Sequence, residues 1–240
     1  MDADESQLQR LLELQAEDSS IRRLQDQRAS LPEAARLSEV NETLAELDSD
    51  IAIAQKQHDE AAREQERLEG EMGILDEKIE REENRLFAGT VSNPKELSAL
   101  QAEVAMLKRN RSETEDSILE VMVNRDQMKG TLDSLNAERS QAAVEAGDLS
   151  QKVAELTKGI DAELRAFEQA RSEAAESLPA DLVALYEKLR DAKHGVGAAA
   201  LVNGTCEGCH TKLPSKEVER LKAERGVQRC DNCRRILVVL

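Results

Sequence analysis

Apolar residues recur alternately every three and every four positions from Leu97 to Ala174. Of the 23 positions in this series, 18 are apolar, and the series keeps one phase over eleven heptads. A 3.5-residue repeat of this length predicts a long α-helix that supercoils left-handedly around a partner helix. It also argues against a disordered chain, which needs no such periodicity. We expect this helix to extend from Pro94 to Leu178.

A second stripe with the same spacing runs from Leu37 to Leu86, and 12 of its 15 positions are apolar. The segment between the two stripes carries a helix stop followed by a helix start. Gly89 can end the first helix in a left-handed conformation, and Asn93 then precedes Pro94 as the N-cap of the second helix. Two helices joined by a short loop run antiparallel.

These signals predict an antiparallel coiled-coil hairpin with its tip at residues 87–94. In this register Leu86 faces Leu97, and Leu37 faces Ala146. A dimer of parallel copies is the alternative, and the turn residues at the tip favour the hairpin over it. Three arginines interrupt the long stripe, where we expect them to fix the register by pairing with acids on the facing arm: Arg111, Arg125 and Arg139.

The first 36 residues carry a looser apolar stripe, whose phase does not continue into Leu37. Pro32 lies at the change of phase, and a proline inside a helical pattern breaks or kinks the helix. We therefore expect residues 1–178 to form one hairpin whose first arm is broken near Pro32. The stripe expected to face residues 149–174 consists of Leu8, Leu11, Leu14, Ile21, Leu24 and Leu31.

Pro179 ends the long helix and opens a shorter one, which we expect to be a connecting helix within residues 179–193. The apolar segment VGAAALV then predicts a strand that ends at an Asn203-Gly204 turn. The last segment, RRILVVL, predicts a second strand that could pair with the first. We place the start of a separate domain at residue 194.

All four cysteines lie in this last domain, residues 194–240, as two C-x2-C pairs separated by 20 residues. Two such pairs supply the four thiolates of a tetrahedral structural Zn²⁺ site, with no ligand position left open for catalysis. Iron accepts the same four thiolates, so the spacing leaves both metals open. A redox pair would need one reactive C-x2-C pair at a helix N-terminus, a context that is missing here. The predicted metal ligands are Cys206, Cys209, Cys230 and Cys233.

Gly208 lies inside the first C-x2-C pair, where we expect a positive φ that helps backbone amides turn toward sulfur. Between the pairs, Ser215 is predicted to cap a short helix that ends before Gly226. The expected fold is mainly α, with a long antiparallel coiled-coil hairpin and a small C-terminal α+β zinc-ribbon domain.

The formal net charge of −16 is spread unevenly over the 240 residues. Residues 1–193 hold 25 Lys and Arg against 44 Asp and Glu, whereas residues 194–240 hold 8 against 5. Zn²⁺ bound by four thiolates would lower the balance of the ribbon to about +1. Contact with nucleic-acid phosphates is therefore expected only from the ribbon, which has no aromatic residue to stack on bases. The candidate residues for phosphate contact are Lys212, Lys216, Arg220, Arg229, Arg234 and Arg235.

The hairpin tip is the other candidate binding surface. The chain holds only two phenylalanines, and one of them, Phe87, lies at the tip, where helix capping does not require it. Phe87 is either an exposed docking anchor or folded back over the last heptad. Secondary-channel transcription factors also carry a coiled-coil hairpin, but their tips depend on acidic residues, and residues 86–95 include none. The candidate partner-binding residues are Phe87, Val91, Asn93 and Lys95.

No segment approaches the roughly 20 apolar residues that span a bilayer, and the first ten residues lack the pattern of a secretion signal. Thiols in two tight pairs fit a reducing compartment. We therefore expect a cytoplasmic protein with no membrane partner. No Ser/His/Asp set, phosphate loop or facing carboxylate pair is recognisable, so we do not expect an enzyme.

The tip GTVSNPKELSALQAEVAMLK, the segment ETEDSILEVM after it, and the ribbon NGTCEGCHTKLPSKEVERL…RCDNCRRILV resemble those of the bacterial C4-type zinc-ribbon coiled-coil family. The resemblance covers essentially the whole chain. It implies an antiparallel hairpin that carries a zinc ribbon, with the four cysteines as ligands of a structural Zn²⁺. Members are described as adaptor or nucleic-acid-binding proteins, and some are linked to an alternative sigma factor, flagellar assembly or type III secretion.

The sequence thus predicts a non-enzymatic zinc-binding adaptor or scaffold, monomeric or weakly dimeric, that binds macromolecular partners through the hairpin tip and the ribbon. The alternative is a regulatory protein that binds RNA or DNA through the basic ribbon. Transcription or secretion machinery is the candidate protein partner that the resemblance implies. Because members of the family differ in their partners, the identity of the partner stays open.

Overall fold

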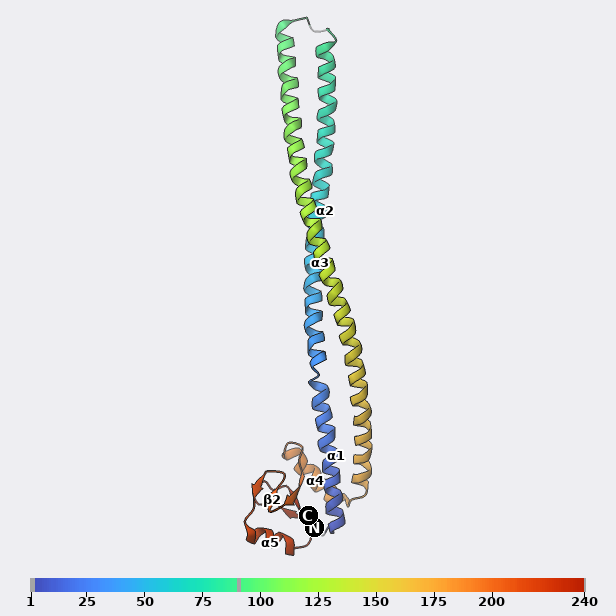
Figure 1. Ribbon diagram of the computed structural model, residues 1–240, viewed down its shortest axis with the longest axis vertical. Helices are drawn as coiled ribbons and strands as arrows, with labels where there is room; N and C mark the ends of the chain where they lie inside the picture. The colour runs from blue at the N-terminus through green and yellow to red at the C-terminus, as the bar shows by residue number, and fades with distance from the viewer. Residues whose placement is uncertain (1–2, 90–91, 240) are drawn as a thin grey trace. The chain divides into compact units, whose positions relative to one another are not determined.

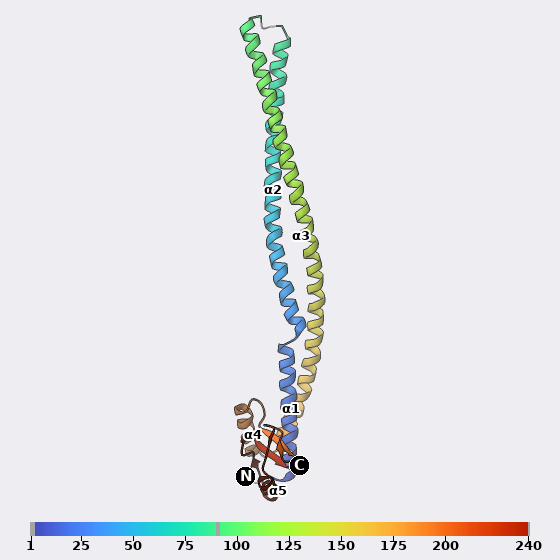
Figure 2. The same cartoon turned by 60° about the vertical axis from the view of Figure 1, so that its left-hand side comes forward.

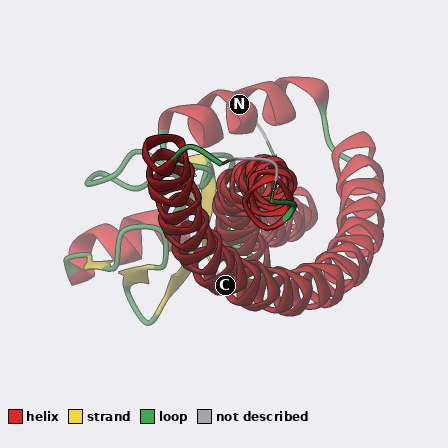
Figure 3. Cartoon of the chain, turned by 90° about the horizontal axis from the view of Figure 1, so that it is seen from above, coloured by secondary structure: helices red, strands yellow, loops and turns green. Residues whose placement is uncertain are grey.

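The computed structural model describes residues 3–89 and 92–239 of the chain. It consists of two compact units, which we call the hairpin unit (residues 37–148) and the ribbon unit (residues 1–36 and 149–240). Helices account for most of the chain, and the strands are short (Figure 3). None of the helices in the described ranges is long and apolar enough to cross a bilayer.

The hairpin unit is built from two antiparallel helices, α2 (Pro32–Phe87) and α3 (Pro94–Glu176), which lie side by side (Figure 1). Within residues 37–148, the buried residues all belong to the two predicted stripes. Burial of each large aliphatic side chain contributes about 1.5–3 kcal/mol. The hairpin prediction is therefore confirmed. The buried residues of this unit are Val40, Ala54, Leu68, Ile79, Leu100, Val104, Leu107, Ile118 and Leu132.

Ion pairs between the two arms agree with this register. Arg111 Nε lies 2.7 Å from Asp76 Oδ1, and Arg139 Nε lies 2.5 Å from Asp48 Oδ1, as predicted for these two arginines. Within the described part of the chain, Arg125 forms no ion pair with the facing arm. Exposed pairs of this kind add less than about 1 kcal/mol each, so they select the register more than they stabilise the fold.

The residues at the hairpin tip have the local structure that their types predict. α2 ends at Phe87, and Gly89 has a φ of +66°, which a glycine adopts without steric cost. The side chain of Asn93 accepts a hydrogen bond of 3.0 Å from the backbone N–H of Lys95, and α3 begins at Pro94. Asn93 is thus the N-cap of α3.

In the ribbon unit, α1 (Glu5–Ala29) ends just before Pro32, the first residue of α2. The predicted break in the first arm is therefore confirmed. α1 packs against the C-terminal part of α3 through a cluster in which Leu164, rather than the predicted Glu163, is buried. A charged carboxylate at this core position would lose its hydration, and the leucine one residue later replaces it. The cluster consists of Ile21, Leu24, Leu31, Ile160 and Leu164.

Leu11 and Leu14 do not face α3 alone, as the simple hairpin predicted. They join a core formed by α1, α4 (Ala180–Ala192) and the strands, and both side chains are fully buried. α1 contacts β1 (Ala198–Val202) and β5 (Ile236–Val239), which are neighbours in the sheet, and it lies beside the strands in Figure 2. The core residues are Leu11, Leu14, Leu178, Leu182, Tyr186, Leu189, Ala198 and Ile236.

The sheet has the strand order β3-β2-β1-β5-β4 and includes the very short strands β2 (Thr205–Cys206), β3 (Thr211–Lys212) and β4 (Gln228–Arg229). β1 and β5 pair in parallel, whereas the other neighbours are antiparallel. β1 and β2 form a hairpin through Asn203 and Gly204, with φ values of 50° and 79°. These values fit the predicted two-residue turn.

The helical insert α5 (Ser215–Ala223) differs in one detail from the prediction. Ser215 is its first helical residue, and Pro214 is the N-cap, without a side-chain capping bond. Proline has no side-chain acceptor, so α5 begins without a side-chain cap, and the carbonyl of Pro214 accepts the first helical hydrogen bonds from the N–H groups of Glu217 and Val218. Gly226 follows the helix with a φ of +91°.

Candidate metal centre

The four cysteines come from two tight turns that the sheet holds face to face. Their sulfur atoms all lie within 4.8 Å of one another, and the pairs Cys206–Cys233 and Cys209–Cys230 are 3.9 and 3.8 Å apart. Four sulfurs bound at about 2.3 Å to one tetrahedral metal lie about 3.8 Å from one another. The separation is far longer than the roughly 2.05 Å of a disulfide. The four thiols therefore fit a single tetrahedral ion.

The two turns share one backbone conformation. The N–H of His210 donates to the carbonyl of Cys206 at 2.7 Å, and the N–H of Arg234 donates to the carbonyl of Cys230 at 2.8 Å. Both donors occupy the left-handed region, with φ values of 57° for His210 and 65° for Arg234. Each C-x2-C pair is thus closed by the residue that follows its second cysteine.

The prediction for Gly208 was wrong in its reason, because Gly208 is not among the residues with positive φ. A Cβ added to Gly208 would lie 2.9 Å from the Cβ of Ala199 and 2.9 Å from the Cδ of Arg235. The glycine is needed because β1 and Arg235 approach its backbone closely.

The pKa values of the cysteine thiols differ between the buried and the more exposed cysteines. Burial raises the pKa of the Cys206 thiol to about 12 and also raises the pKa of Cys230. At Cys209, burial acts in the same direction, but hydrogen bonds from Thr211 and Asn232 lower its pKa to about 6. A bound cation would stabilise all four thiolates and so overcome the cost of burying their charge.

Polar side chains outside the ligand set hold the two turns together. Asn232, in the second turn, donates to Thr211 Oγ1 at 2.8 Å and to the sulfur of Cys209 at 3.6 Å. Arg235 donates from Nη1 to the carbonyl of Gly208 at 2.7 Å, and from Nε and Nη2 to two carbonyls near the start of β1. Such bonds orient ligands and fix the distance between the turns.

This position of Arg235 corrects its predicted role as a phosphate-binding residue, because its guanidinium is occupied by backbone carbonyls. Arg220 is also engaged, with its guanidinium 3.0 Å from Glu224 and 3.8 Å from Asp231. Of the other predicted bases, Lys212, Lys216 and Arg234 are exposed, and Arg229 is half-buried. The basic surface is therefore smaller than the sequence suggests.

At the hairpin tip, Phe87 is 80% exposed, so it does not fold back over the last heptad. Lys95 is also exposed, while the side chain of Asn93 is used to cap α3. Val91 lies outside the described residues. Of the predicted partner-binding residues, Phe87 and Lys95 thus present free surface.

The chain is similar to known proteins over its whole length. The model of the CT398-like coiled coil hairpin domain matches residues 14–194, and that of the C4-type zinc ribbon domain matches residues 205–237. The chain belongs to the CT398-like coiled-coil hairpin family. The zinc-ribbon match, together with the clustered sulfurs, identifies the metal of the four-cysteine site as structural Zn²⁺. The resemblance and the fold class predicted from the sequence are both confirmed.

Proteins similar to this chain cover nearly its whole length. An uncharacterized protein of Mycobacterium tuberculosis (Rv2229c) is 28% identical over 246 residues, covering 100% of this chain and 98% of that protein. A solved Mycobacterium smegmatis structure is 26% identical, with a TM-score of 0.73 and full coverage of both chains. CT398 of Chlamydia trachomatis, at 20% identity, 98% coverage of both chains and a TM-score of 0.77, shares the fold.

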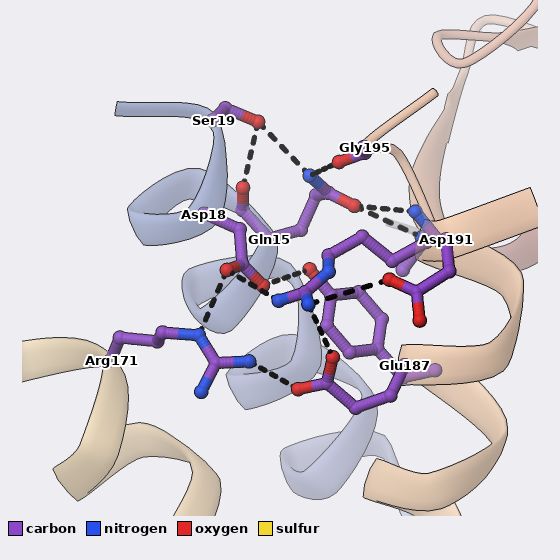
Figure 4. Close-up of polar contacts among 11 residues, drawn as sticks. Gln15, Asp18, Ser19, Arg171, Glu187, Asp191 and Gly195 are labelled. Carbon is purple, nitrogen blue, oxygen red and sulfur yellow. Dashed lines mark hydrogen bonds and ion pairs between the residues drawn. The ribbon is translucent and has the colours of Figure 1, made fainter. Parts of the chain in front are cut away.

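A buried polar network in the ribbon unit was missed by the sequence analysis (Figure 4). The carboxylate of Asp18 accepts hydrogen bonds from Tyr186, Arg171 and Arg190 at 2.6, 2.8 and 2.8 Å. Burial alone would raise the pKa of Asp18, but these three donors together lower it. A signal was present, because Asp18 continues the spacing of Leu11, Leu14 and Ile21 and so occupies a core position.

Gln15 extends this network to the start of the ribbon. Its side-chain oxygen accepts from the N–H of Gly197 at 2.7 Å and of Ala198 at 3.3 Å, and its nitrogen donates to the carbonyl of Gly195 at 3.1 Å. Gln15 thereby satisfies buried backbone groups where β1 begins. Together, Gln15 and Asp18 connect α1 to α3, to α4 and to the sheet.

Proposed function

We propose that this chain is a non-enzymatic, zinc-stabilised adaptor that binds a protein partner through the hairpin tip and a second partner through the zinc ribbon. The observation that carries the proposal is the 80% exposure of Phe87, one of only two phenylalanines in the chain. Transfer of an exposed aromatic side chain out of water is favourable, and it takes place only when another molecule covers the side chain. Aromatic residues also dominate the binding energy of many protein interfaces.

The zinc ribbon supplies the second surface of the adaptor. Four thiolates leave Zn²⁺ no open coordination position, so the ion stabilises the ribbon rather than activating a substrate. The ribbon holds 8 Lys and Arg against 5 Asp and Glu, in contrast to the acidic remainder of the chain. Its exposed bases Lys212, Lys216 and Arg234 suit a partner with an acidic surface.

Affinity capture from a lysate of the source organism, treated with nuclease, tests the role of the tip. Baits are the wild type, Phe87→Ala, and the matched control Ile74→Ala, which removes another exposed apolar side chain from the hairpin unit. We expect at least one captured protein to be lost with Phe87→Ala and kept with Ile74→Ala. If both variants retain every partner of the wild type, the tip is not a binding site.

Nucleic-acid binding through the ribbon is the second candidate function, and the exposure of Lys212, Lys216 and Arg234 favours it. The full zinc-loaded chain is titrated with single-stranded RNA and with duplex DNA at several salt concentrations. Binding that weakens steeply with salt, and further when these three residues become glutamine, would support phosphate contacts. Absence of binding at low salt would remove this candidate.

A further inference from the structure

The hairpin unit carries apolar side chains on the surface of α3 that lie outside the coiled-coil seam. Leu119, Met122 and Val123 are 55%, 36% and 58% exposed, whereas their neighbour Ile118 in the seam is 7% exposed. Residues at i, i+3 and i+4 of a helix share one face, so these three side chains form one patch. Val144, at 63% exposure, lies three heptads after Val123 and points to the same side of the supercoil.

The same helix face allows another helix to approach closely. Gly130 and Ala137 lie at the intermediate heptad positions between Val123 and Val144, and both are exposed. A Cβ added to Gly130 would have no atom within 4 Å, so no packing inside the described chain requires a glycine there. Glycine is unfavourable in the interior of a helix, and small residues permit close helix–helix contact.

Carboxylates lie on this face and beside it. Asp126 and Asp133 lie one and two heptads after Leu119, Asp116 lies one heptad before Val123, and all three are exposed. Glu120 is exposed too, and Arg125 and Lys129 are the nearby bases. The hairpin unit as a whole holds 27 Asp and Glu against 13 Lys and Arg. A second copy of this face would bring like charges together, whereas a basic helix would be attracted.

We propose that the outer face of α3 from Leu119 to Val144 binds an amphipathic helix of a partner protein, one with apolar residues in its centre and Lys or Arg along its flanks. The face is about 38 Å long at 1.5 Å per residue, which corresponds to about seven turns of a partner helix. This surface is separate from the hairpin tip and from the ribbon, and it does not depend on their proposed function.

The test uses the full zinc-loaded chain and two synthetic helical peptides of equal length. Both carry the same leucine and alanine face, and their remaining positions are lysine in one peptide and glutamate in the other. Fluorescence anisotropy measures their affinity for the wild type and for the triple variant Leu119→Gln, Met122→Gln, Val123→Gln. The matched control is Ile53→Gln with Ile74→Gln, which alters two apolar residues of α2 that are each 55% exposed.

We expect the lysine peptide to bind the wild type and the α2 control equally, and the triple variant about tenfold more weakly or worse. The glutamate peptide should not bind. A second variant, Asp126→Lys with Asp133→Lys, should lower the affinity for the lysine peptide and raise the affinity for the glutamate peptide. This variant tests the charges without altering the apolar patch. Circular dichroism checks that each variant keeps the helix content of the wild type.

Several results would overturn the proposal. If the lysine peptide does not bind the wild type, or binds the triple variant with the same affinity, the apolar patch binds no such helix. Equal loss in the α2 control would show a general attraction to exposed apolar residues. A wild type that sediments as a dimer while the triple variant is monomeric would assign the face to a second copy of this chain.

Discussion

The hydroxyl of Tyr186 donates a hydrogen bond of 2.6 Å to the carboxylate of Asp18, which lies 168 residues earlier in the chain. Tyr186 is fully buried, and Asp18 is 9% exposed. Arg171 and Arg190 share the same carboxylate and are themselves joined through Glu187 (Figure 4). This arrangement connects α1, α3 and α4 around a single buried charge, and so makes the ribbon unit sensitive to one residue.

Replacement of Asp18 by alanine should destabilise the ribbon unit by about 3 kcal/mol or more, because it leaves the two arginines without their shared anion in a buried site. Tyr186→Phe removes one hydrogen bond and should cost about 1 kcal/mol. Urea unfolding followed by circular dichroism measures both effects. The matched control is Asp161→Asn, which breaks the exposed pair with Arg28 and should cost less than about 1 kcal/mol. Equal losses for Asp18→Ala and Asp161→Asn would contradict a special role for the network.

The contribution of Asp18 to stability should depend on pH. The folded protein lowers the pKa of Asp18 below its ordinary value of 3.8, so the unfolded chain takes up a proton there more readily. The stabilisation is therefore fully present above about pH 4 and is lost as the pH falls through the lowered pKa of the folded state. The free energy of unfolding of the wild type, minus that of Asp18→Asn, should be constant near neutral pH and shrink below pH 4. If this difference in the free energy of unfolding instead grows as the pH falls, the folded protein does not lower the pKa of Asp18.

Removal of zinc should unfold the ribbon and leave the long helices intact. The ribbon core contains two of the ligands and a few small or aliphatic side chains, so much of its stability must come from the metal. We expect one zinc ion per chain and, after chelation or in Cys230→Ser, loss of amide protection in β1 and β5. Hydrogen exchange measures this protection residue by residue, and far-UV circular dichroism should change little. Retained protection of β1 and β5 without metal would show that the sheet folds by itself.

The two residues that close the cysteine turns should tolerate glycine. His210 and Arg234 have positive φ values, a conformation that costs roughly 1 kcal/mol for a residue with a Cβ. His210→Gly and Arg234→Gly are each expected to stabilise the zinc-loaded protein by up to about 1 kcal/mol. Thermal unfolding of the variants measures the gain.

Gly208→Ala gives the opposite expectation at a neighbouring position. Its new methyl group would lie 2.9 Å from both Ala199 Cβ and Arg235 Cδ, which forces β1 or the guanidinium to move. We expect a loss of about 1–3 kcal/mol together with weaker zinc binding in a competition with a chromophoric chelator. Unchanged stability and zinc affinity would show that the turn relaxes without cost.

The parts of the fold that rest on local patterns were predictable from the sequence. The alternation of three and four residues identified the buried face of the hairpin, including Leu68 and Leu107, because a helix repeats its faces at a constant spacing. Asn203-Gly204 predicted a tight turn through its own backbone preferences, and the spacing of the cysteines predicted one metal site. Each of these signals is contained within a few neighbouring residues or in one regular repeat.

Tertiary structure decided what depends on which distant segments meet. It assigned Arg235 to the backbone of the first cysteine turn instead of to solvent, gave Gly208 its steric reason, and left Phe87 exposed. It also brought Asp18 to Tyr186, an acid in a stripe of leucines whose partners lie more than 150 residues away. A charged residue at a core position is unfavourable until its partners are in place, and only the folded chain supplies them.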